Sequence, residues 1–371
     1  MAGLYIHIPF CASRCIYCDF YSTTSRNRTH FIPRLLDEAR AALANFPTRT
    51  FRTVYIGGGT PSQLTPLEIN TLANGLSEIF DLANVEEFTL EMNPEDVTPQ
   101  YVAALPSAIN RVSMGVQSFI DSELQLLRRR HNSQRPAEAV RILRDKGIHN
   151  ISIDLMYGLP TQTLDSFSRS IDRAIELDTP HISAYNLSVE EGTPLAKMVK
   201  NGEISVADDE LCNDMNTLLR NKLRASGFEQ YEISNYAREG YESRHNSSYW
   251  DGAPYLGLGP GAHSFDGQCR RWWNEPDLAA YLIGQCPTVQ ETLTADDRYN
   301  ERVMLGLRTA RGVNGFALAK NFPSQHQNTF LPVSKRLIDE GTLLANETTG
   351  DIRIAPDALH LADYIIRELM V

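Results

Sequence analysis

The sequence predicts an α/β protein built on a parallel sheet, and three observations lead to this fold class. Short β-branched and aromatic runs alternate with helix-like segments about six times before residue 236. Capping residues mark several helix starts, and a glycine marks a helix end. Repeated strand–helix units place their strands side by side in parallel, joined by right-handed crossovers. About six units form either a doubly wound sheet or an incomplete barrel, and in both the functional residues lie at the carboxyl ends of the strands.

Each expected element has its own signal in the chain. The strands are short apolar runs at positions 4–8, 53–56, 87–92, 111–116, 151–156 and 181–187. Thr65-Pro66-Leu67-Glu68 predicts a helix start with a capping box, in which the two polar side chains satisfy free backbone N–H groups. Thr98-Pro99 repeats the threonine-plus-proline start. A helix over 137–146 is expected to end at Gly147, because glycine readily adopts the left-handed conformation of a helix cap.

The pattern changes after residue 236. Residues 240–275 are rich in glycine, aromatic and polar side chains, and they predict a long functional loop because the aromatic content argues against disorder. From residue 295 the chain is expected to form a small module with helices over 296–308 and 332–340. A hairpin is expected around Thr348-Thr349-Gly350-Asp351.

Composition and charge narrow the class of protein. The chain has 371 residues, and 35 Lys and Arg against 46 Asp and Glu give a formal charge of −11. Apolar residues make up 42%, which is typical of a globular protein. A net acidic chain is a poor general binder of nucleic acid, whose affinity for proteins comes from neutralised phosphates. No apolar run approaches the roughly 18 residues that span a bilayer, and no export signal is visible, so we expect a cytoplasmic protein.

Three of the six cysteines form a CxxxCxxC cluster directly after the first expected strand. Cys11, Cys15 and Cys18 can converge on one inorganic centre. A structural zinc ion needs four ligands, and no fourth Cys or His lies at suitable spacing. A 4Fe–4S cluster held by three cysteines leaves one iron open to bind the amino and carboxylate groups of S-adenosylmethionine. The spacing therefore favours an iron–sulfur site over zinc or a chance grouping. Cys212 and Cys269 are interpreted as structural.

Polar and glycine residues recur where strands end. Gly57-Gly58-Gly59-Thr60-Pro61 follows the second strand, where glycines let backbone groups approach a charged ligand, although such a run is also an ordinary turn. Glu91, Gln117 and Asp154 lie at later strand ends, where a sheet covered on both faces is usually apolar. They are either hydrogen-bonded core or capping residues or parts of one ligand site, and their recurrence favours the site. Arg128-Arg129-Arg130-His131 is either a solvated helix end or the source of an arginine for a ligand carboxylate.

Together these motifs resemble a known family. The residues that carry the resemblance are Tyr5-Ile6-His7-Ile8-Pro9-Phe10-Cys11 with Cys15 and Cys18, residues 57–61, Met114-Gly115-Val116-Gln117 and Asp154-Leu155-Met156-Tyr157-Gly158-Leu159-Pro160. They are similar to the radical SAM family of oxygen-independent coproporphyrinogen III oxidases and their HemW-type relatives, over nearly the whole chain. The resemblance implies an incomplete (β/α)6 barrel followed by a small, mainly helical C-terminal domain.

The resemblance also implies roles for individual residues. Cys11, Cys15 and Cys18 would hold the 4Fe–4S cluster. The S-adenosylmethionine contacts would be Tyr5, Tyr17, Gly58, Gly59, Thr60, Glu91, Gln117, Arg129 and Asp154. The expected division is a radical SAM partial barrel over 1–235, a connecting segment with an HNxxYW motif over 236–294, and a winged-helix-like domain over 295–371.

Two features separate the branches of this family. The oxidase branch has a CxxxCxxCxC motif and a substantial N-terminal extension, whereas Phe20 stands at the fourth cysteine position here and the first strand begins at Leu4. His245-Asn246-Ser247-Ser248-Tyr249-Trp250 fits the HNxxYW signature of HemW-type heme chaperones. The resemblance therefore implies a heme chaperone without coproporphyrinogen oxidase activity. The alternatives are the oxidase that converts coproporphyrinogen III to protoporphyrinogen IX, and another radical SAM enzyme such as a methyltransferase.

A heme site can also be weighed from residue types. Neutral imidazole is a good axial ligand for heme iron, and Tyr249 and Trp250 offer flat apolar faces to a porphyrin. His245 is either that ligand or a hydrogen-bonded structural histidine, and the resemblance favours the ligand. His263 is a weaker candidate, and Cys286 is interpreted as structural. The expected partners are heme and heme-accepting apoproteins, with the membrane surface as one place of transfer and a homodimer as one candidate assembly.

Overall fold

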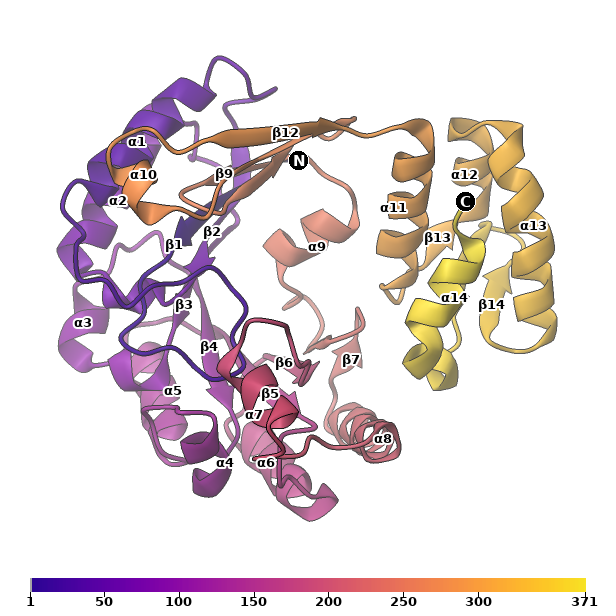
Figure 1. Ribbon diagram of the computed structural model, residues 1–371, viewed down its shortest axis with the longest axis horizontal. Helices are drawn as coiled ribbons and strands as arrows, with labels where there is room; N and C mark the ends of the chain where they lie inside the picture. Colours follow the sequence, from indigo (N-terminus) through magenta and orange to yellow (C-terminus); the bar gives the residue numbers. More distant parts are fainter. Residues whose placement is uncertain (1) are drawn as a thin grey trace.

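The computed structural model describes residues 2–371. Its centre is a curved sheet of parallel strands in chain order (Figure 1). These strands are β1 (Ala2–Ile8), β2 (Phe51–Gly58), β3 (Glu87–Met92), β4 (Arg111–Gln117), β5 (Asn150–Tyr157) and β6 (His181–Asn186). Every neighbouring pair runs parallel. All the strands expected from the sequence are therefore confirmed, with ends that differ by at most two residues.

The order of the strands decides between the two expected topologies. Strands β1 to β6 neighbour one another in sequence order, whereas a doubly wound sheet reverses its order at a switch point. At the two ends, β9 (Tyr255–Leu258) pairs in parallel with β1, and β8 (Asn235–Ala237) pairs antiparallel with β6. The sheet thus stays open between β1 and β6. The fold is the incomplete (β/α)6 barrel with a further C-terminal part, as expected.

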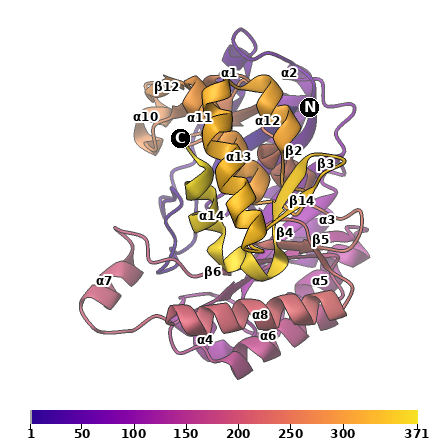
Figure 2. The same cartoon turned by 90° about the vertical axis from the view of Figure 1, so that its right-hand side faces the viewer.

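Helices cover the outer face of the sheet (Figure 1). They are α1 (Phe31–Ala42), α2 (Pro66–Ile79), α3 (Pro99–Ala103), α4 (Asp121–Leu126), α5 (Arg135–Asp145), α6 (Leu164–Glu176) and α8 (Asp209–Ala225), while the short α7 (Pro194–Lys200) projects from the barrel (Figure 2). The capping box at Thr65, the cap at Thr98 and the left-handed Gly147, with φ of 92°, are confirmed. One face of β1 is apolar, with Leu4, Ile6 and Ile8 fully buried, whereas the opposite face carries Tyr5 and His7.

The expectation of a long loop over 240–275 is wrong. The segment forms helix α9 (Arg244–Trp250) and strands β9, β10 (His263–Phe265) and β11 (Arg270–Asn274), followed by α10 (Leu278–Leu282) and β12 (Thr288–Thr292). Strands this short are too brief to show an alternating pattern, so periodicity misses them. A local signal was present, because the Ser243 side chain caps α9 by accepting from the Asn246 N–H. Together with β8 and β7 (Glu229–Gln230), these strands extend the barrel sheet to twelve strands.

The C-terminal residues lie beside the barrel (Figure 1, Figure 2) and have their own apolar core. The helices are α11 (Ala295–Leu307), α12 (Gly315–Asn321), α13 (Ser324–Asp339) and α14 (Ala362–Leu369), and the sheet consists of β13 (Val313–Asn314), β15 (Asp351–Ile354) and β14 (Leu343–Asn346). The first expected helix and the hairpin are confirmed. The second helix begins eight residues before its expected start, because Pro332 lies inside α13 rather than at its first turn. Across residues 2–371, no helix is both long and apolar enough to cross a membrane.

Candidate functional site

The carboxyl ends of the barrel strands surround a cavity of about 560 Å³, which we call the cysteine cavity. Cys11, Cys15 and Cys18 all line it, from the loop that follows β1. Eight of the expected cofactor contacts line it as well: Tyr17, Gly58, Gly59, Thr60, Glu91, Gln117, Arg129 and Asp154. The parallel strands therefore bring together residues that are up to 143 positions apart in the chain, from Cys11 to Asp154.

Two kinds of contact hold the cysteine loop: backbone hydrogen bonds between its two ends and the packing of one buried apolar side chain. The Cys11 N–H donates to the Thr23 carbonyl at 2.9 Å, and the Thr23 N–H donates to the Pro9 carbonyl at 2.7 Å. Between the cysteines, the fully buried Ile16 packs with Leu195 of α7, and the Leu195 N–H donates to its carbonyl at 2.9 Å. Because these contacts fix the loop, the three thiols keep their positions relative to one another. None of these contacts involves a thiol, so the loop does not need the thiols to fold.

The surroundings of the thiols suit ligation by thiolate. The Thr60 hydroxyl lies 3.4 Å from the Cys11 sulfur, and the Arg129 guanidinium lies 3.5 Å from the Cys15 sulfur. Burial raises the pKa of the Cys11 and Cys18 thiols, so in the absence of a ligand they hold their protons and release them when they bind metal. No three His, Cys, Asp or Glu side chains within residues 2–371 form a group that could enclose a single metal ion. A cubane cluster instead takes its three cysteines on three separate irons, which three thiols sharing one cavity fit.

The glycine run is packed too tightly for side chains. The Gly59 N–H donates to the Ile8 carbonyl at 2.8 Å, which ties the run to the end of β1. A Cβ atom on Gly59 would lie 2.9 Å from the Pro9 backbone carbon, and a Cβ on Gly58 would lie 2.7 Å from the His7 ring. Gly58 also has φ of 111°, which side-chain-bearing residues rarely adopt. The run therefore exposes backbone groups, rather than side chains, to the cysteine cavity.

Glu91 is the central acid of the cavity. Its carboxylate accepts from the Tyr55 hydroxyl at 2.7 Å and from the Gly58 N–H at 3.1 Å. Burial, with the Asp154 charge adding to it, raises the pKa of Glu91 to about 7. Burial likewise raises the pKa of Asp154 to about 6, while Ser113 donates to that carboxylate at 3.4 Å. Two carboxylates that resist ionisation side by side are poised to accept a cationic ligand group.

We expect Glu91→Gln to stabilise the ligand-free protein at about pH 8. The folded pKa of Glu91 lies above its ordinary value, so the wild-type fold loses stability as pH rises from about 4.5 to 7, by at most about 3 kcal/mol. Glutamine removes that cost, because its amide can still accept from the Gly58 N–H and donate to the Tyr55 hydroxyl. Thermal melts should show a higher midpoint for the variant at about pH 8 and little difference near pH 5. An unchanged midpoint at both pH values, as expected for the exposed control Glu347→Gln, would contradict this reasoning.

A left-handed turn directs Arg129 into the cavity. Helix α4 ends at Leu126, and Arg128 has φ of 58°, which turns the chain back so that the Arg129 N–H donates to the Leu124 carbonyl at 2.9 Å. The Arg129 guanidinium then donates to the Asn93 side chain at 2.7 Å and to the Gly115 carbonyl at 2.6 Å. Arg129 is therefore not part of a solvated helix end, which was one of the two interpretations of Arg128-Arg129-Arg130-His131.

A β-bulge directs Gln117 toward the same place. The pairing of β4 with β5 shifts by one residue between Gly115 and Gln117, and Gln117 has φ of 69°. Such a shift re-aims the side chains at the end of a strand. Gly115 leaves the necessary space, since a Cβ atom there would lie 3.0 Å from the Gln117 amide nitrogen.

Sequence reasoning missed several residues of the cavity wall. Tyr55 holds Glu91, and Asn93 accepts from Arg129. Arg111 is 1% exposed, and its Nε lies 3.9 Å from the Glu87 carboxylate. Its Nε and Nη1 are buried and have no hydrogen-bond partner among the described residues. The signal for Arg111 was available, because an arginine at the start of a strand covered on both faces must be paired or must face a ligand.

The HNxxYW segment is a helix rather than the expected loop, and it is fixed to the barrel. The Glu87 carboxylate accepts from the N–H groups of Arg244 (2.8 Å) and His245 (3.0 Å) at the start of α9. His245 is 1% exposed, and its ring nitrogens contact the Thr53 hydroxyl and the Tyr249 hydroxyl, each at 2.9 Å. Burial lowers the pKa of His245 to about 3, so the ring is neutral.

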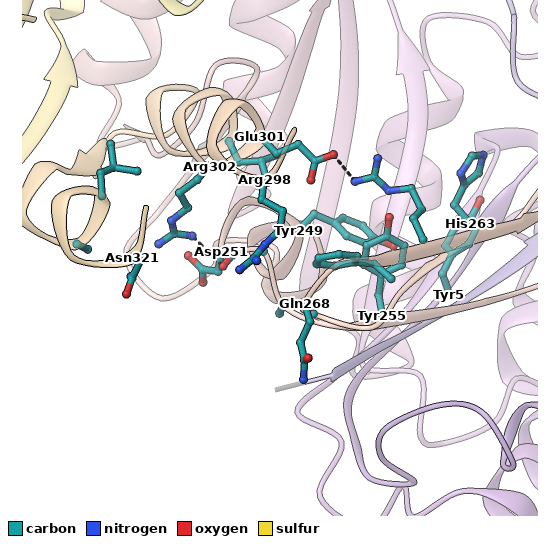
Figure 3. A pocket seen from close by; sticks show the side chains of 18 of the residues that line it. Tyr5, Tyr249, Asp251, Tyr255, His263, Gln268, Arg298, Glu301, Arg302 and Asn321 are labelled. Atoms are coloured by element: carbon teal, nitrogen blue, oxygen red, sulfur yellow. Dashed lines mark hydrogen bonds and ion pairs between the residues drawn. The ribbon is translucent and has the colours of Figure 1, made fainter. Parts of the chain in front are cut away.

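Helix α9 separates the cysteine cavity from a second, larger cavity. This cavity has a volume of about 880 Å³, and we call it the aromatic cleft. It lies between strands β9 to β11 on one side and helices α11 and α12 on the other, with Tyr249, Tyr255 and His263 in its wall (Figure 3). Asn246 of α9 lines the cysteine cavity, whereas Tyr249 lines the cleft. Tyr5 lines the cleft rather than the cysteine cavity, although its ring centroid lies 6.2 Å from that of Tyr55 in the cavity wall.

Two of the expected heme residues therefore lie outside both cavities. The described walls of the cysteine cavity and the aromatic cleft include neither His245 nor Trp250. The Trp250 indole nitrogen is buried and has no hydrogen-bond partner among the described residues. Of the HNxxYW side chains predicted to contact heme, Tyr249 alone reaches a described cavity wall.

Comparisons with known proteins agree in sequence and in fold. The profile of the Radical SAM superfamily matches residues 5–174, and that of the HemN C-terminal domain matches residues 293–349. Heme chaperone HemW of Mycobacterium tuberculosis is 37% identical over 380 residues, which cover 99% of this chain and 94% of the relative. Heme chaperone HemW of Escherichia coli is 34% identical, with 80% of this chain and 79% of the relative covered.

A mitochondrial relative and a solved structure extend the comparison. The radical S-adenosyl methionine domain-containing protein 1 of Bos taurus is 39% identical, covering 84% of this chain and 74% of the relative. The structure of coproporphyrinogen III oxidase (HemN) from Escherichia coli, described as a radical SAM enzyme, superposes with a TM-score of 0.83. It covers 100% of this chain and 90% of that chain at 22% identity, so it shows a shared fold.

Proposed function

The chain belongs to the HemW family within the radical SAM superfamily, and from this premise we propose that it is a heme chaperone, which binds heme and passes it to heme-accepting proteins. Membership of the superfamily implies a 4Fe–4S cluster and S-adenosylmethionine as cofactors. The heme, the acceptor proteins and the individual site residues are parts of the proposal. Family membership supports all three parts, and the geometry of the two cavities adds support for the heme and for the site residues.

In this proposal the cysteine cavity holds the cofactors. Cys11, Cys15 and Cys18 ligate the cluster, which supplies an open iron for S-adenosylmethionine and an electron that can be passed to it. Arg129 stays beside the Cys15 sulfur, where its charge favours the thiolate. The Glu91 carboxylate, held by Tyr55 and the Gly58 N–H, faces the amino group of the methionine part. Asp154, whose charge helps to raise the pKa of Glu91, supplies a second carboxylate to S-adenosylmethionine from the same cavity wall.

The observation that carries the heme part of the proposal is the aromatic cleft next to the cysteine cavity. Asp19 and Phe20, which follow Cys18 directly, line both cavities. Phe20 is 70% exposed and stands where the oxidase branch has its fourth cysteine. A wide cleft with aromatic and charged walls beside a cofactor site suits a flat ligand with charged edges that enters and leaves intact.

The HNxxYW motif supports this cleft in two ways. Tyr249 contributes its ring to the wall, where it meets the Tyr255 ring edge-on with centroids 4.7 Å apart. His245 fixes Tyr249 by its hydrogen bond, and Glu87 fixes the start of the helix. Trp250 completes α9 one residue later. The motif residues thus act together as one support of the heme-binding wall.

One sample can test the proposal against the oxidase alternative. The protein is reconstituted anaerobically with iron and sulfide, titrated with hemin, and then assayed with coproporphyrinogen III, S-adenosylmethionine and a reductant. We expect heme binding with about one heme per chain, transfer of that heme to an apo-globin used as the acceptor probe, and no protoporphyrinogen IX. Formation of protoporphyrinogen IX together with failure to bind hemin would overturn the proposal in favour of the oxidase.

A further inference from the structure

The two walls of the aromatic cleft carry different chemistry. On the barrel side, the antiparallel strands β10 and β11 place His263 opposite Trp273 and Phe265 opposite Arg271, so all four side chains project from one face. That face borders the cleft, since His263, Phe265 and Arg271 line it. On the other side, helix α11 contributes Arg298, Glu301, Arg302 and Leu305 (Figure 3). Aromatic rings thus face a row of charged groups across the cleft.

His263 has the properties of an available iron ligand. It is exposed, and no described residue forms a hydrogen bond with its ring. The ring stacks on Trp273, with centroids 5.3 Å apart and planes at 16°. Stacking covers the face of the imidazole but leaves its nitrogens free, because they bind in the plane of the ring. Partial burial and the Arg271 charge lower the pKa of His263, which keeps the ring in the neutral form that binds metals.

His245 lacks this availability. Both of its ring nitrogens are already bonded, to the Thr53 hydroxyl and to the Tyr249 hydroxyl, and the side chain is 1% exposed. Ligation by His245 would have to break one of these buried bonds and move α9 away from Glu87. Ligation by His263 would break no hydrogen bond of its ring to a described residue and would need no movement of α9.

The basic residues of α11 fit the two carboxylates of heme. Arg298 and Arg302 are four residues apart, so they lie one turn apart on the same face of the helix. No described acidic side chain forms an ion pair with either, and Arg302 donates only to the Asp251 carbonyl at 3.0 Å. Two of the three acids among the described cleft residues are already paired: Glu301 with Arg271 and Asp251 with Arg311, each at 2.7 Å. The third, Asp19, lies on the cysteine loop. Guanidinium groups bind carboxylates strongly and with defined geometry.

We propose that heme lies in the aromatic cleft with the His263 imidazole on its iron and with Arg298 and Arg302 beside its propionates. This inference rests on the proposed heme-binding function and adds to it a position and a ligand. The cleft volume of about 880 Å³ lies within the range of cofactor pockets. Tyr249 and Tyr255, which lie between the α11 arginines and His263 in the view of Figure 3, supply the apolar surface for the porphyrin.

Hemin titration of four variants tests the ligand and the propionate site separately. For His263→Ala we expect a shifted Soret maximum and affinity at least roughly tenfold weaker; for Arg298→Gln with Arg302→Gln we expect similar weakening with an unshifted maximum. His245→Gln should keep the wild-type maximum, because its ring is not on the iron, although its affinity falls through Tyr249. His149→Ala removes another exposed histidine outside the cleft and should match the wild type.

The outcomes separate this inference from the proposed function. If wild-type protein binds heme and His263→Ala keeps the wild-type maximum and affinity, the inference fails while the function stands. If His245→Gln is the one variant that shifts the Soret maximum, the iron ligand lies on α9 and the inference about His263 is also overturned. If wild-type protein binds no heme, the proposed function itself fails. Thermal melts and iron content identify any misfolded variant, and the exposed positions of His263 and Arg298 make their variants the least prone to misfold.

Discussion

Replacement of Cys11, Cys15 or Cys18 by alanine should each reduce bound iron to background after anaerobic reconstitution. In the proposed site each thiolate holds a different iron. No other cysteine lines the cysteine cavity among the described residues, so a missing ligand has no substitute there. The loop should remain folded, because it is held by the Thr23 hydrogen bonds and by Ile16 rather than by the thiols. Iron and sulfide analysis, with the visible absorbance of the cluster, measures the loss.

Two other cysteines provide matched controls. Cys212 lies on α8 and Cys269 directly before β11, and both are partly exposed like the cluster cysteines. Alanine at either position should leave iron content and absorbance at the wild-type level. Zinc in stoichiometric amount and no iron in the wild-type protein would contradict the assignment, as would a cluster that survives in any of the three loop variants.

The barrel could be predicted because its signals are local and repeated. Each strand of the barrel carries buried apolar residues at alternate positions, as Phe88, Leu90 and Met92 do in β3. Helix caps such as Thr65 act within four residues. The short strands β9 to β11 could not be predicted in the same way. They exist because β9 pairs with β1 and packs against α1, which lie far away in the sequence, and no local pattern records that pairing.

The cysteine cavity was predictable for a related reason. In a parallel barrel, residues at strand ends meet whatever their separation, so Cys11, Glu91 and Asp154 could be grouped before their distances were known. The prediction of the heme residues rested on their closeness in sequence, because the HNxxYW motif was taken to place its side chains at one site. A helix distributes adjacent residues around its axis, so His245 is buried, Asn246 lines one cavity and Tyr249 lines the other.

We expect the combined variant Glu91→Gln, Asp154→Asn to lose S-adenosylmethionine affinity by at least roughly a hundredfold. Each substitution removes one carboxylate from the cavity and thus one charge-assisted contact with the ligand, while the shape of the wall stays the same. Isothermal titration of the reconstituted protein, with iron content checked first, measures the effect. The loss cannot come from unfolding, because Glu91→Gln is expected to make the ligand-free fold more stable. Glu347→Gln, an exposed substitution outside the cavity, should bind as the wild type does.

The pH dependence of binding provides an independent check of the same two groups. With its pKa raised to about 7 by burial, Glu91 is largely protonated at about pH 6 and ionised at about pH 8, so wild-type affinity for a cationic amino group should rise across this interval. Asp154, whose pKa burial raises to about 6, steepens the rise at its lower end. Glu91→Gln alone should bind more weakly than wild type at about pH 8 and should lose most of the rise. Wild-type affinity that is flat between these values, or that falls with pH, would mean that Glu91 does not face the amino group, and the ligand would then have to bind by the Arg129 side of the cavity.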